Sequence, residues 1–471
     1  MMNELLDMSA SELVLAYRGK ALSPVELMRA VLEQVHSLDP QLNAFRVVDE
    51  EGALQDATAS ERRWLQGTPC GPLDGVPVSV KDMVATRGMS TLFGSCTLPP
   101  GHLAELDAPC VELLRRAGAV IFGKTTTTEF GNKIVSDSPL TGVTRNPWNP
   151  SLSAGGSSSG AGAALAARMG PLAVGTDGGG SIRVPAAWNG VCGLKPSFKR
   201  VPTMEPHNVG ELSNVGPMAR SVQDLALMLT AMARPWPADW QSFGGPVEDY
   251  CRGLNRGVEG LRVAFSATLG IIDVDPQITT AACNAARLLE QMGARVSWLE
   301  AVEPLQGYMK SEMHSILWMA RSEQLVRHTP EPLRQLMDPE ILELADCGRR
   351  LSAVRLMDAL QARMELASAM HAFFARYDVL VCPSFHRLPP PNPGLPPDMR
   401  MAPPLTSWCN QTQQPAASVP CGLSREGLPI GLQVIGPRFH DGLVLRVCRG
   451  YEQARGAFPA PPMVLAEEAS T

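Results

Sequence analysis

The sequence lacks an apolar run of the roughly 18–20 residues that a membrane-spanning helix needs, so we expect no membrane segment. Its first residues, MMNELLDMSASELV, are acidic and contain no basic segment followed by an apolar one, which argues against a secretory signal. The formal net charge of −6 leaves no strongly basic surface for nucleic acid. The 11 cysteines include no CxxC or CxxxC pair. We therefore expect free thiols in the cytoplasm, with neither a disulfide framework nor a metal site.

Lysine is scarce as well. The chain has seven lysines against 34 arginines, and five of the seven lie between Lys81 and Lys199. By contrast, hydrophobic residues make up 45% of the chain and charged residues 19%, which is typical of a folded globular protein with a large core. The 471 residues are enough for one large α/β domain or for two ordinary ones.

Helical and strand patterns alternate along the chain. A Ser-Pro-Val-Glu signature at 23–26 starts a helix that continues to Val35, and a second helix is expected over 51–65. Further elements are a strand over 75–80, a helix over 110–117, a strand over 119–122, a helix over 161–168, a strand over 172–174 and a β-α-β unit within 255–300. This alternation predicts an α/β fold with a large mixed, mostly parallel twisted sheet that is covered by helices on both faces.

We expect the whole chain, 1–471, to form a single domain. Its parts are N-terminal helices over 1–70, a core with glycine-rich turns over 71–200, a helical cap rich in Met and Leu over about 305–376, and an α/β return over 377–471. Within the return, 387–404 is proline-rich and irregular, 428–436 is a strand and 442–454 is a closing helix.

Two glycine-rich turns stand out between residues 155 and 181. The first, GGSSSG at 155–160, lacks the Gly-Lys-Ser/Thr ending of a phosphate-binding loop, which argues against a nucleotide site. The second places three consecutive glycines before Ser181, so that backbone N–H groups can converge on one point without interference from side chains. The turn therefore suits a serine nucleophile beside its own oxyanion hole. From the turn alone, a simple N-cap role for Ser181 explains the pattern equally well.

A serine nucleophile also needs a base. None of the eight histidines lies in a turn of small residues, and the sequence has no G-x-S-x-G elbow. Lys81, however, ends the apolar strand over 75–80. Burial lowers the pKa of a lysine and supplies a neutral amine near neutral pH. An ordinary surface lysine remains the alternative at this point.

Three segments are distinctive when taken together: GVPVSVKD at 75–82, GGSSSG at 155–160 and GTDGGGSIRVPAAWNGVCGLKPS at 175–197. In these segments the chain resembles the amidase signature family. The separations of 76 residues from Lys81 to Ser157 and 24 from Ser157 to Ser181 are those of the family's Ser-Ser-Lys triad. Weaker matches extend the resemblance into the C-terminal segment, with QPAASVPCG at 414–422 and LPIGLQVIGP at 428–437.

The resemblance implies roles for individual residues. Ser181 would be the acyl nucleophile, Ser157 the bridging serine and Lys81 the final base, with a cis peptide bond between Gly156 and Ser157. Residues implied as oxyanion donors are Gly178, Gly179, Gly180 and Ser181, and those implied as supporting hydrogen-bonding residues are Ser158, Asp177 and Arg183. No metal or other cofactor is implied.

Three positions depart from the family pattern. Ser159 stands where glycine is common, Gly178 where a larger residue is common, and Gln413 where many members have glycine. None of these changes removes a member of the triad. They bear on the preferred substrate and leave the expected mechanism intact.

The resemblance implies an amidase that hydrolyses a small carboxamide or an N-acyl amine. The alternative is the glutaminase-type catalytic subunit of a tRNA-dependent amidotransferase, which commonly has glutamine where this chain has Val184. We expect the protein to bind a small-molecule amide as its substrate and to bind neither nucleic acid nor a membrane. A homodimer is compatible with the sequence. Pocket walls are expected from 305–376, 200–215 and 400–412, where Met309, Trp318, Met319 and Trp408 either line an apolar acyl or aryl site or fill the core.

Overall fold

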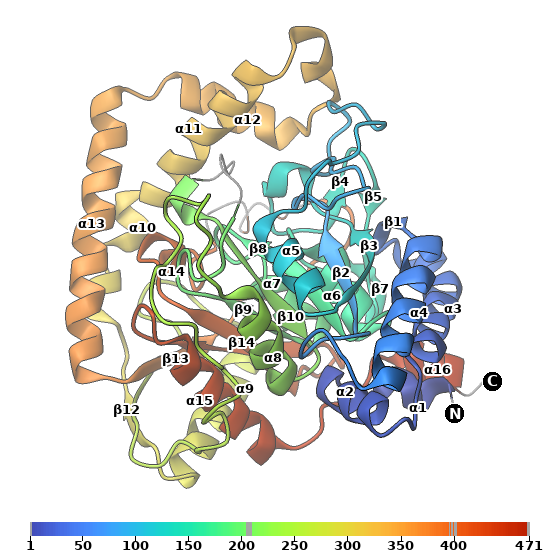
Figure 1. Cartoon of the computed structure of the whole chain (residues 1–471). Helices are drawn as coiled ribbons and strands as arrows, with labels where there is room; N and C mark the ends of the chain where they lie inside the picture. Colours follow the sequence, from blue (N-terminus) through green and yellow to red (C-terminus); the bar gives the residue numbers. More distant parts are fainter. Residues whose placement is uncertain (1, 204–209, 395, 397–398, 400–402, 469–471) are drawn as a thin grey trace.

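The computed structural model describes residues 2–203, 210–394, 396, 399 and 403–468, and its centre is an 11-stranded sheet. Figure 1 shows the sheet between the N-terminal helices and the helices of residues 308–376. In spatial order the strands are β1 (Phe45–Val48), β3 (Val120–Thr125), β2 (Pro77–Lys81), β8 (Leu172–Asp177), β10 (Asn214–Ala219), β9 (Cys192–Lys195), β14 (Ala416–Leu423), β15 (Pro429–Ile435), β13 (Val379–Pro383), β11 (Arg262–Phe265) and β12 (Arg295–Trp298). Two small hairpins, β4 (Asp137–Ser138) with β5 (Gly142–Val143) and β6 (Arg145–Asn146) with β7 (Asn149–Ser153), lie outside it.

The predicted α/β class with a mixed sheet is confirmed, but the expectation of mostly parallel pairing is wrong. Of the ten neighbouring pairs, four are parallel (β3–β2, β2–β8, β13–β11 and β11–β12) and six are antiparallel. Parallel pairing is confined to the two ends of the sheet, where helices connect the strands. At the centre, β14 and β15 form a hairpin, and a short connection of this kind allows only antiparallel pairing.

The N-terminal helices pack beside β1 and β3 (Figure 1). They are α1 (Met2–Asp7), α2 (Ala10–Arg18), α3 (Pro24–Leu42) and α4 (Glu50–Gln66). The predicted start of α3 is confirmed, because the Ser23 side chain caps the first turn and Glu26 completes the capping box. The helix predicted over 51–65 is α4.

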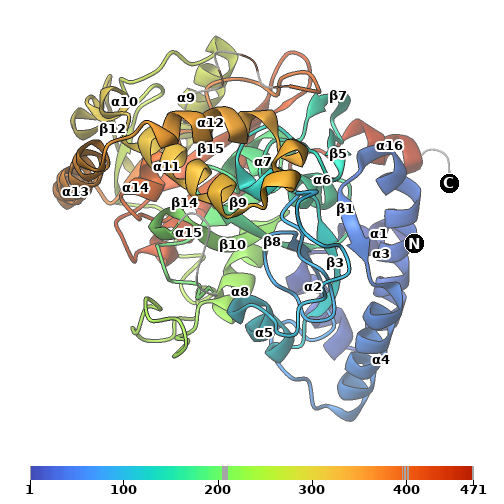
Figure 2. The ribbon, with the colours of Figure 1, turned by 90° about the horizontal axis from the view of Figure 1, so that it is seen from above.

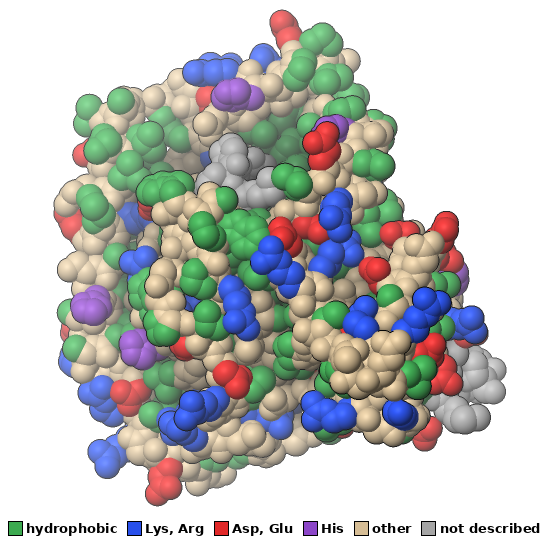
Figure 3. Space-filling view, in the orientation of Figure 1, with side chains coloured by type: hydrophobic (Ala, Val, Ile, Leu, Met, Phe, Trp, Pro, Cys, Tyr) green, Lys and Arg blue, Asp and Glu red, His purple; other side chains and the backbone are tan. Residues whose placement is uncertain are grey.

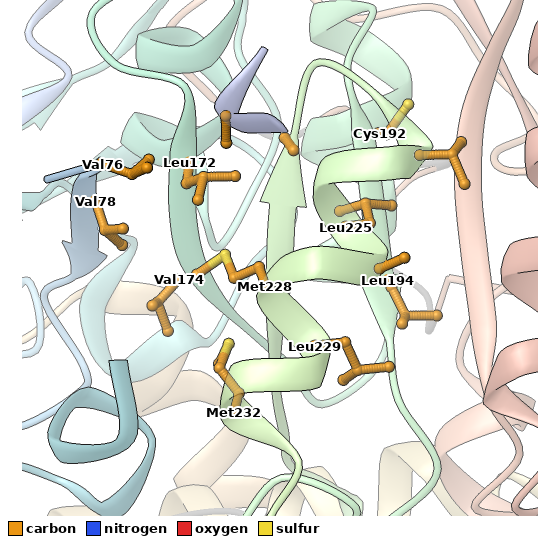
Figure 4. Close-up of a cluster of buried hydrophobic side chains, with 14 of the residues drawn as sticks. Val76, Val78, Leu172, Val174, Cys192, Leu194, Leu225, Met228, Leu229 and Met232 are labelled. Atoms are coloured by element: carbon orange, nitrogen blue, oxygen red, sulfur yellow. The ribbon is translucent and has the colours of Figure 1, made fainter. Parts of the chain in front are cut away.

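Helices cover both faces of the sheet, as predicted. On one face α8 (Val222–Met232) packs against the sheet, and Figure 4 shows its Leu225, Met228, Leu229 and Met232 over Val76, Val78, Leu172, Val174 and Leu194. Successive side chains of a strand point to opposite faces, so Ala173 packs against Ala161 and Leu165 of α6 on the other face. Other helices around the sheet are α5 (Pro109–Arg116), α6 (Ser159–Ala166), α7 (Arg183–Asn189), α9 (Pro276–Gln291), α15 (Asp441–Arg455) and α16 (Pro462–Glu468).

The segment predicted as a helical cap is helical. Its main helices are α10 (Tyr308–Ser311), α11 (Met313–His328), α12 (Pro339–Arg349) and α13 (Ala353–Arg376), with α14 (Trp408–Gln411) beneath them. In both ribbon views α11 and α12 lie side by side across one end of the sheet (Figures 1 and 2). Phe130 anchors this pair, because it packs with Val326 of α11 and Ile341 of α12. Short 3-10 turns occupy Glu129–Gly131, Gly210–Leu212, Glu303–Leu305 and Glu331–Leu336.

The C-terminal return contains the predicted strand β15 and helix α15. Among the strands that were not predicted are β10 and β14. In β10, Gly216 and Pro217 interrupt the usual strand pattern, although Pro217 pairs with Val174 in the middle of the sheet. None of the helices in the described part of the chain is both long enough and apolar enough to cross a membrane.

Candidate active site

Lys81 is the last residue of β2 and is completely buried. Its Nζ lies 2.7 Å from Ser157 Oγ and 2.8 Å from Thr176 Oγ1. Both neighbours are neutral hydroxyls, and no carboxylate within the described residues forms an ion pair with this amine. Burial lowers the pKa of Lys81 well below its usual value, and the nearby charge of Asp177 offsets only part of this effect. The lowered pKa favours the neutral form of the amine, which is the form able to accept a proton.

Ser157 lies in the turn between β7 and α6. The peptide bond between Gly156 and Ser157 is cis, as expected. Ser157 is buried, and Gly131 passes so close that a Cβ atom at this position would lie 3.1 Å from Ser157 Oγ. Because Gly131 also has a φ of +69°, a larger residue there would both strain the backbone and crowd Ser157. Ser159 begins α6, and its buried Oγ has no hydrogen-bond partner within the described residues.

Ser181 lies in the tight turn that joins β8 to α7. It is 8% exposed and lines a cavity, and its Oγ makes no hydrogen bond to the described part of the chain. The N-cap of α7 is Ile182, so the alternative role of Ser181 as a helix cap does not apply. The Ser158 N–H donates to the Ser181 carbonyl at 3.1 Å, which ties the two glycine-rich turns together. Ser158 Oγ donates to the Thr176 carbonyl at 3.2 Å.

The oxyanion donors differ from the expectation at one position. The Gly180 N–H donates to Asp177 Oδ1 at 2.8 Å, so the expectation that Gly180 supplies a free donor is wrong. The N–H groups of Gly178, Gly179 and Ser181 have no acceptor among the described residues and remain available. Thr406 Oγ1 donates to the Gly179 carbonyl at 2.6 Å and holds the turn from outside.

Asp177 and Arg183 form a buried ion pair beneath the turn. Arg183 Nε and Nη2 donate to the two carboxylate oxygens at 3.0 and 2.9 Å, and both side chains are 0% exposed. Burial alone would raise the pKa of Asp177, but the charge and hydrogen bonds of Arg183 hold it well below its usual value. Arg183 Nη1 also donates to the Thr406 carbonyl and to Gln433 Oε1, and Nη2 donates to Asn410 Oδ1. The pair thus connects the turn to segments more than 200 residues away.

A cavity of about 170 Å³ opens beside Ser181, beneath the cap helices. In Figure 3 this side of the molecule is hollowed below the cap, and hydrophobic side chains lie around the hollow. The cavity is lined by Gly131, Asn132, Lys133, Ile134, Gly179, Ser181, His314, Ser315, Trp318, Met319, Glu340, Leu344, Met399 and Pro403.

The expected pocket walls are only partly those observed. Trp318 and Met319 line the cavity, whereas Trp408 is fully buried in a second core and Met309 packs against that core. From the expected wall segment 400–412, Pro403 lines the cavity, and so does Met399 just before the segment. Residues 400–402 of this segment and residues 204–209 of the expected segment 200–215 lie outside the described residues.

Several residues of this site were not predicted. Thr176 contacts Lys81. Its place just before Asp177 in the glycine-rich segment is a signal from which the sequence could have identified it. His314, Thr406, Asn410 and Gln433 are far away in sequence, and no local pattern marks them. Within the described residues, no group of three or more His, Cys, Asp or Glu side chains is arranged to hold a metal ion.

Comparison with known proteins places this chain among amide-cleaving enzymes. The family model described as Amidase matches residues 26–445. An acylamidase of Rhodococcus erythropolis is 35% identical over 461 residues, which cover 95% of each chain. A glutamyl-tRNA(Gln) amidotransferase subunit of Myxococcus xanthus is 33% identical over 487 residues, 97% of this chain and 99% of the relative. A solved bacterial aryl acylamidase of the amidase signature family has a TM-score of 0.88 at 30% identity, and covers 95% of this chain and 96% of its own.

The buried ion pair leads to a stability prediction. Arg183→Met leaves the Asp177 carboxylate buried without its counter-ion, which should lower the free energy of unfolding by about 3–5 kcal/mol. Arg349→Met is the control, because Arg349 forms ion pairs at the surface with a side chain that is 58% exposed, and it should change stability by about 0.5 kcal/mol or less. Urea unfolding measures both. Equal midpoints for the two variants would contradict the assigned importance of the buried pair.

Proposed function

The chain belongs to the amidase signature family, and from this premise we propose that it hydrolyses the C–N bond of a small carboxamide or N-acyl amine through an acyl-enzyme on Ser181. The observation that carries the proposal is the buried amine of Lys81, 2.7 Å from the hydroxyl of Ser157 and shielded from water. Ser181 lines the cavity, and its carbonyl accepts a hydrogen bond at 3.1 Å from the N–H of Ser158, the residue after Ser157. This link supports a base, a relay and a nucleophile that act together.

In the acylation step, Ser181 Oγ attacks the carbonyl carbon of the amide. The Ser181 proton passes to Ser157 Oγ, and the Ser157 proton passes to Lys81 Nζ. The N–H groups of Gly178, Gly179 and Ser181 stabilise the negative charge that develops on the carbonyl oxygen. When the C–N bond breaks, Ser157 donates a proton to the leaving amine and recovers one from Lys81. Water enters next, and the same relay removes its proton so that it cleaves the ester and restores Ser181.

The cavity favours an apolar acyl or aryl group. Ile134, Trp318, Met319, Leu344, Met399 and Pro403 contribute apolar surface to it. Val184, which follows Arg183 on α7, is fully buried in a cluster with Ile134 and Met399, so that the wall behind the cavity is apolar too. The similarity to an acylamidase and to an aryl acylamidase supports the same substrate class.

The alternative function, ammonia supply within a tRNA-dependent amidotransferase, is favoured by the similarity to the glutamyl-tRNA(Gln) amidotransferase of Myxococcus xanthus. Free glutamine carries both a carboxylate and an ammonium group. In the cavity Lys133 already bridges Asp137 and Asp338, each at 2.6 Å, which leaves it poorly placed to bind a further carboxylate.

We therefore expect the purified protein to release amine from N-acyl aryl amines and no ammonia from glutamine. The measurement is product formation from both substrates at equal concentration, with a glutamyl-tRNA(Gln) amidotransferase as the positive control for glutaminase activity. Glutamine hydrolysis in the absence of anilide hydrolysis would favour the amidotransferase role.

The nucleophile is tested by Ser181→Ala, which should abolish covalent labelling by a serine-directed inhibitor and reduce hydrolysis to background. The matched control is Ser159→Ala, because Ser159 is buried nearby, its Oγ has no partner within the described residues, and it takes no part in the relay. Mass spectrometry of the labelled protein should show one adduct in wild type and in Ser159→Ala. An adduct that persists in Ser181→Ala would reject the assignment.

The base is tested by the pH dependence of kcat/KM. Protonated Lys81 cannot accept a proton, so activity should fall as the pH falls through the Lys81 pKa, which burial places well below 10.5. Lys81→Met should reduce activity by about 10²–10⁴-fold and remove this acid limb. Lys195→Met is the control, because burial also lowers the pKa of Lys195, to about 8, but its Nζ donates to the Pro196 carbonyl and does not contact the serines. Loss of the acid limb in this control alone would contradict the assignment.

A further inference from the structure

The cavity contains one histidine that the proposed mechanism does not use. His314 is the second residue of α11, is 6% exposed and lines the cavity together with Gly179 and Ser181. Burial lowers its pKa to about 4, with the charge of Asp177 offsetting part of the effect, so the imidazole is neutral near neutral pH. A buried neutral imidazole has one N–H donor, and its hydrogen-bond partners decide which nitrogen carries it.

Gln411 decides the position of this proton. Its side-chain Nε2 lies 3.1 Å from His314 Nδ1, and Gln411 Oε1 has no hydrogen-bond partner within the described residues. In this orientation of the amide, Nε2 donates, Nδ1 accepts and the imidazole proton is on Nε2. Gln411 is itself 1% exposed, and Arg363 Nε donates to its backbone carbonyl at 2.9 Å, which holds the main chain at this position.

A second contact sets the plane of the ring. His314 stacks on Trp318 with ring centroids 5.1 Å apart and an angle of 15° between the planes. Trp318 Nε1 in turn donates to Asn132 Oδ1 at 2.9 Å. The imidazole is therefore held both by its Nδ1 atom and by its face.

The free edge of the ring faces the nucleophile turn. A Cβ atom on Gly179 would lie 2.9 Å from His314 Cε1 and 3.2 Å from Nε2, so the edge that carries the proton lies against Gly179. The neighbouring N–H groups of Gly179 and Ser181 have no acceptor among the described residues, whereas that of Gly180 is committed to Asp177. The Nε2–H donor of His314 therefore lies beside a turn in which the N–H groups of Gly179 and Ser181 are available and that of Gly180 is not.

We propose that His314, as a neutral imidazole, donates a hydrogen bond from Nε2 to the substrate oxygen that becomes the oxyanion, and that Gln411 is the positioning residue that keeps the proton on Nε2. The proposal rests on the proposed function, because it requires an acyl transfer at Ser181. It adds to the backbone oxyanion hole a donor from the cap helices. No proton leaves His314 during the reaction.

The first test compares His314→Ala with His314→Gln, using an N-acyl aryl amine. Removal of one oxyanion donor should lower kcat by about 10²–10³-fold in His314→Ala while KM stays close to that of wild type, since the bond strengthens as charge develops. His314→Gln keeps a side-chain N–H donor and should recover part of the loss. His371→Ala, a change on α13 away from this cavity, should behave as wild type. An unchanged kcat with a raised KM in His314→Ala would overturn the proposal and leave His314 as a wall residue.

The second test measures binding of a trifluoromethyl ketone, which forms an oxyanion on the nucleophilic serine. His314→Ala should weaken its binding by the same factor by which kcat falls, and equal binding to wild type and variant would overturn the proposal. Serine-directed labelling separates this outcome from a failure of the proposed function. If wild type forms the Ser181 adduct, the acyl-enzyme mechanism stands, and the kcat and binding data for His314→Ala then decide the role of His314 alone. Absence of the adduct in wild type rejects the mechanism itself.

Gln411 is tested by a double-mutant cycle. Gln411→Met should lower kcat while KM stays unchanged, because the imidazole proton is then free to move to Nδ1. In the His314→Ala background the same change should have little further effect, since its only route to the reaction has been removed. Additive losses in the double variant would show that Gln411 acts independently of His314, and would overturn its positioning role.

Discussion

The site depends on one buried amine that has no counter-ion in contact with it within the described residues. Lys81 lies at the end of a strand with β3 on one side and β8 on the other, and its amine contacts the hydroxyl groups of Ser157 and Thr176 and, at 3.5 Å, the Thr176 carbonyl, all of them uncharged. Desolvation disfavours the ammonium form, so the interior of the sheet lowers the pKa of this amine and favours the form that can accept a proton. A surface lysine at the same distance from Ser157 would remain protonated and would be of no use as a base.

The same burial has the opposite result at Asp177, because a partner is present there. The two guanidinium hydrogen bonds from Arg183 keep this carboxylate charged, and the carboxylate in turn receives the N–H groups of Gly180 and Ile182. The carboxylate therefore holds the turn before Ser181 in shape, and its charge offsets only part of the effect of burial on the pKa of Lys81. Burial thus leaves Asp177 charged, because Arg183 pairs with it, and lowers the pKa of Lys81, which has no counter-ion in contact within the described residues.

The cap helices make the cavity from distant parts of the chain. His314 and Trp318 approach from α11, while Asn132 and Ile134 belong to the segment that follows β3. The buried Lys81–Ser157 contact thus comes from the sheet and a glycine-rich turn, whereas much of the cavity wall comes from the cap. Changes in the cap are therefore able to alter the substrate without altering the relay.

The sequence by itself determined the features that depend on near neighbours. The helix start at Ser23, the two glycine-rich turns and the order of Lys81, Ser157 and Ser181 follow from residue type and spacing. The tertiary structure decided the rest. Only packing shows that the centre of the sheet is antiparallel, that the N–H of Gly180 is directed at Asp177, and that His314 meets Gly179. These outcomes rest on contacts between segments far apart in the chain, and local propensity carries no information about which distant surfaces meet.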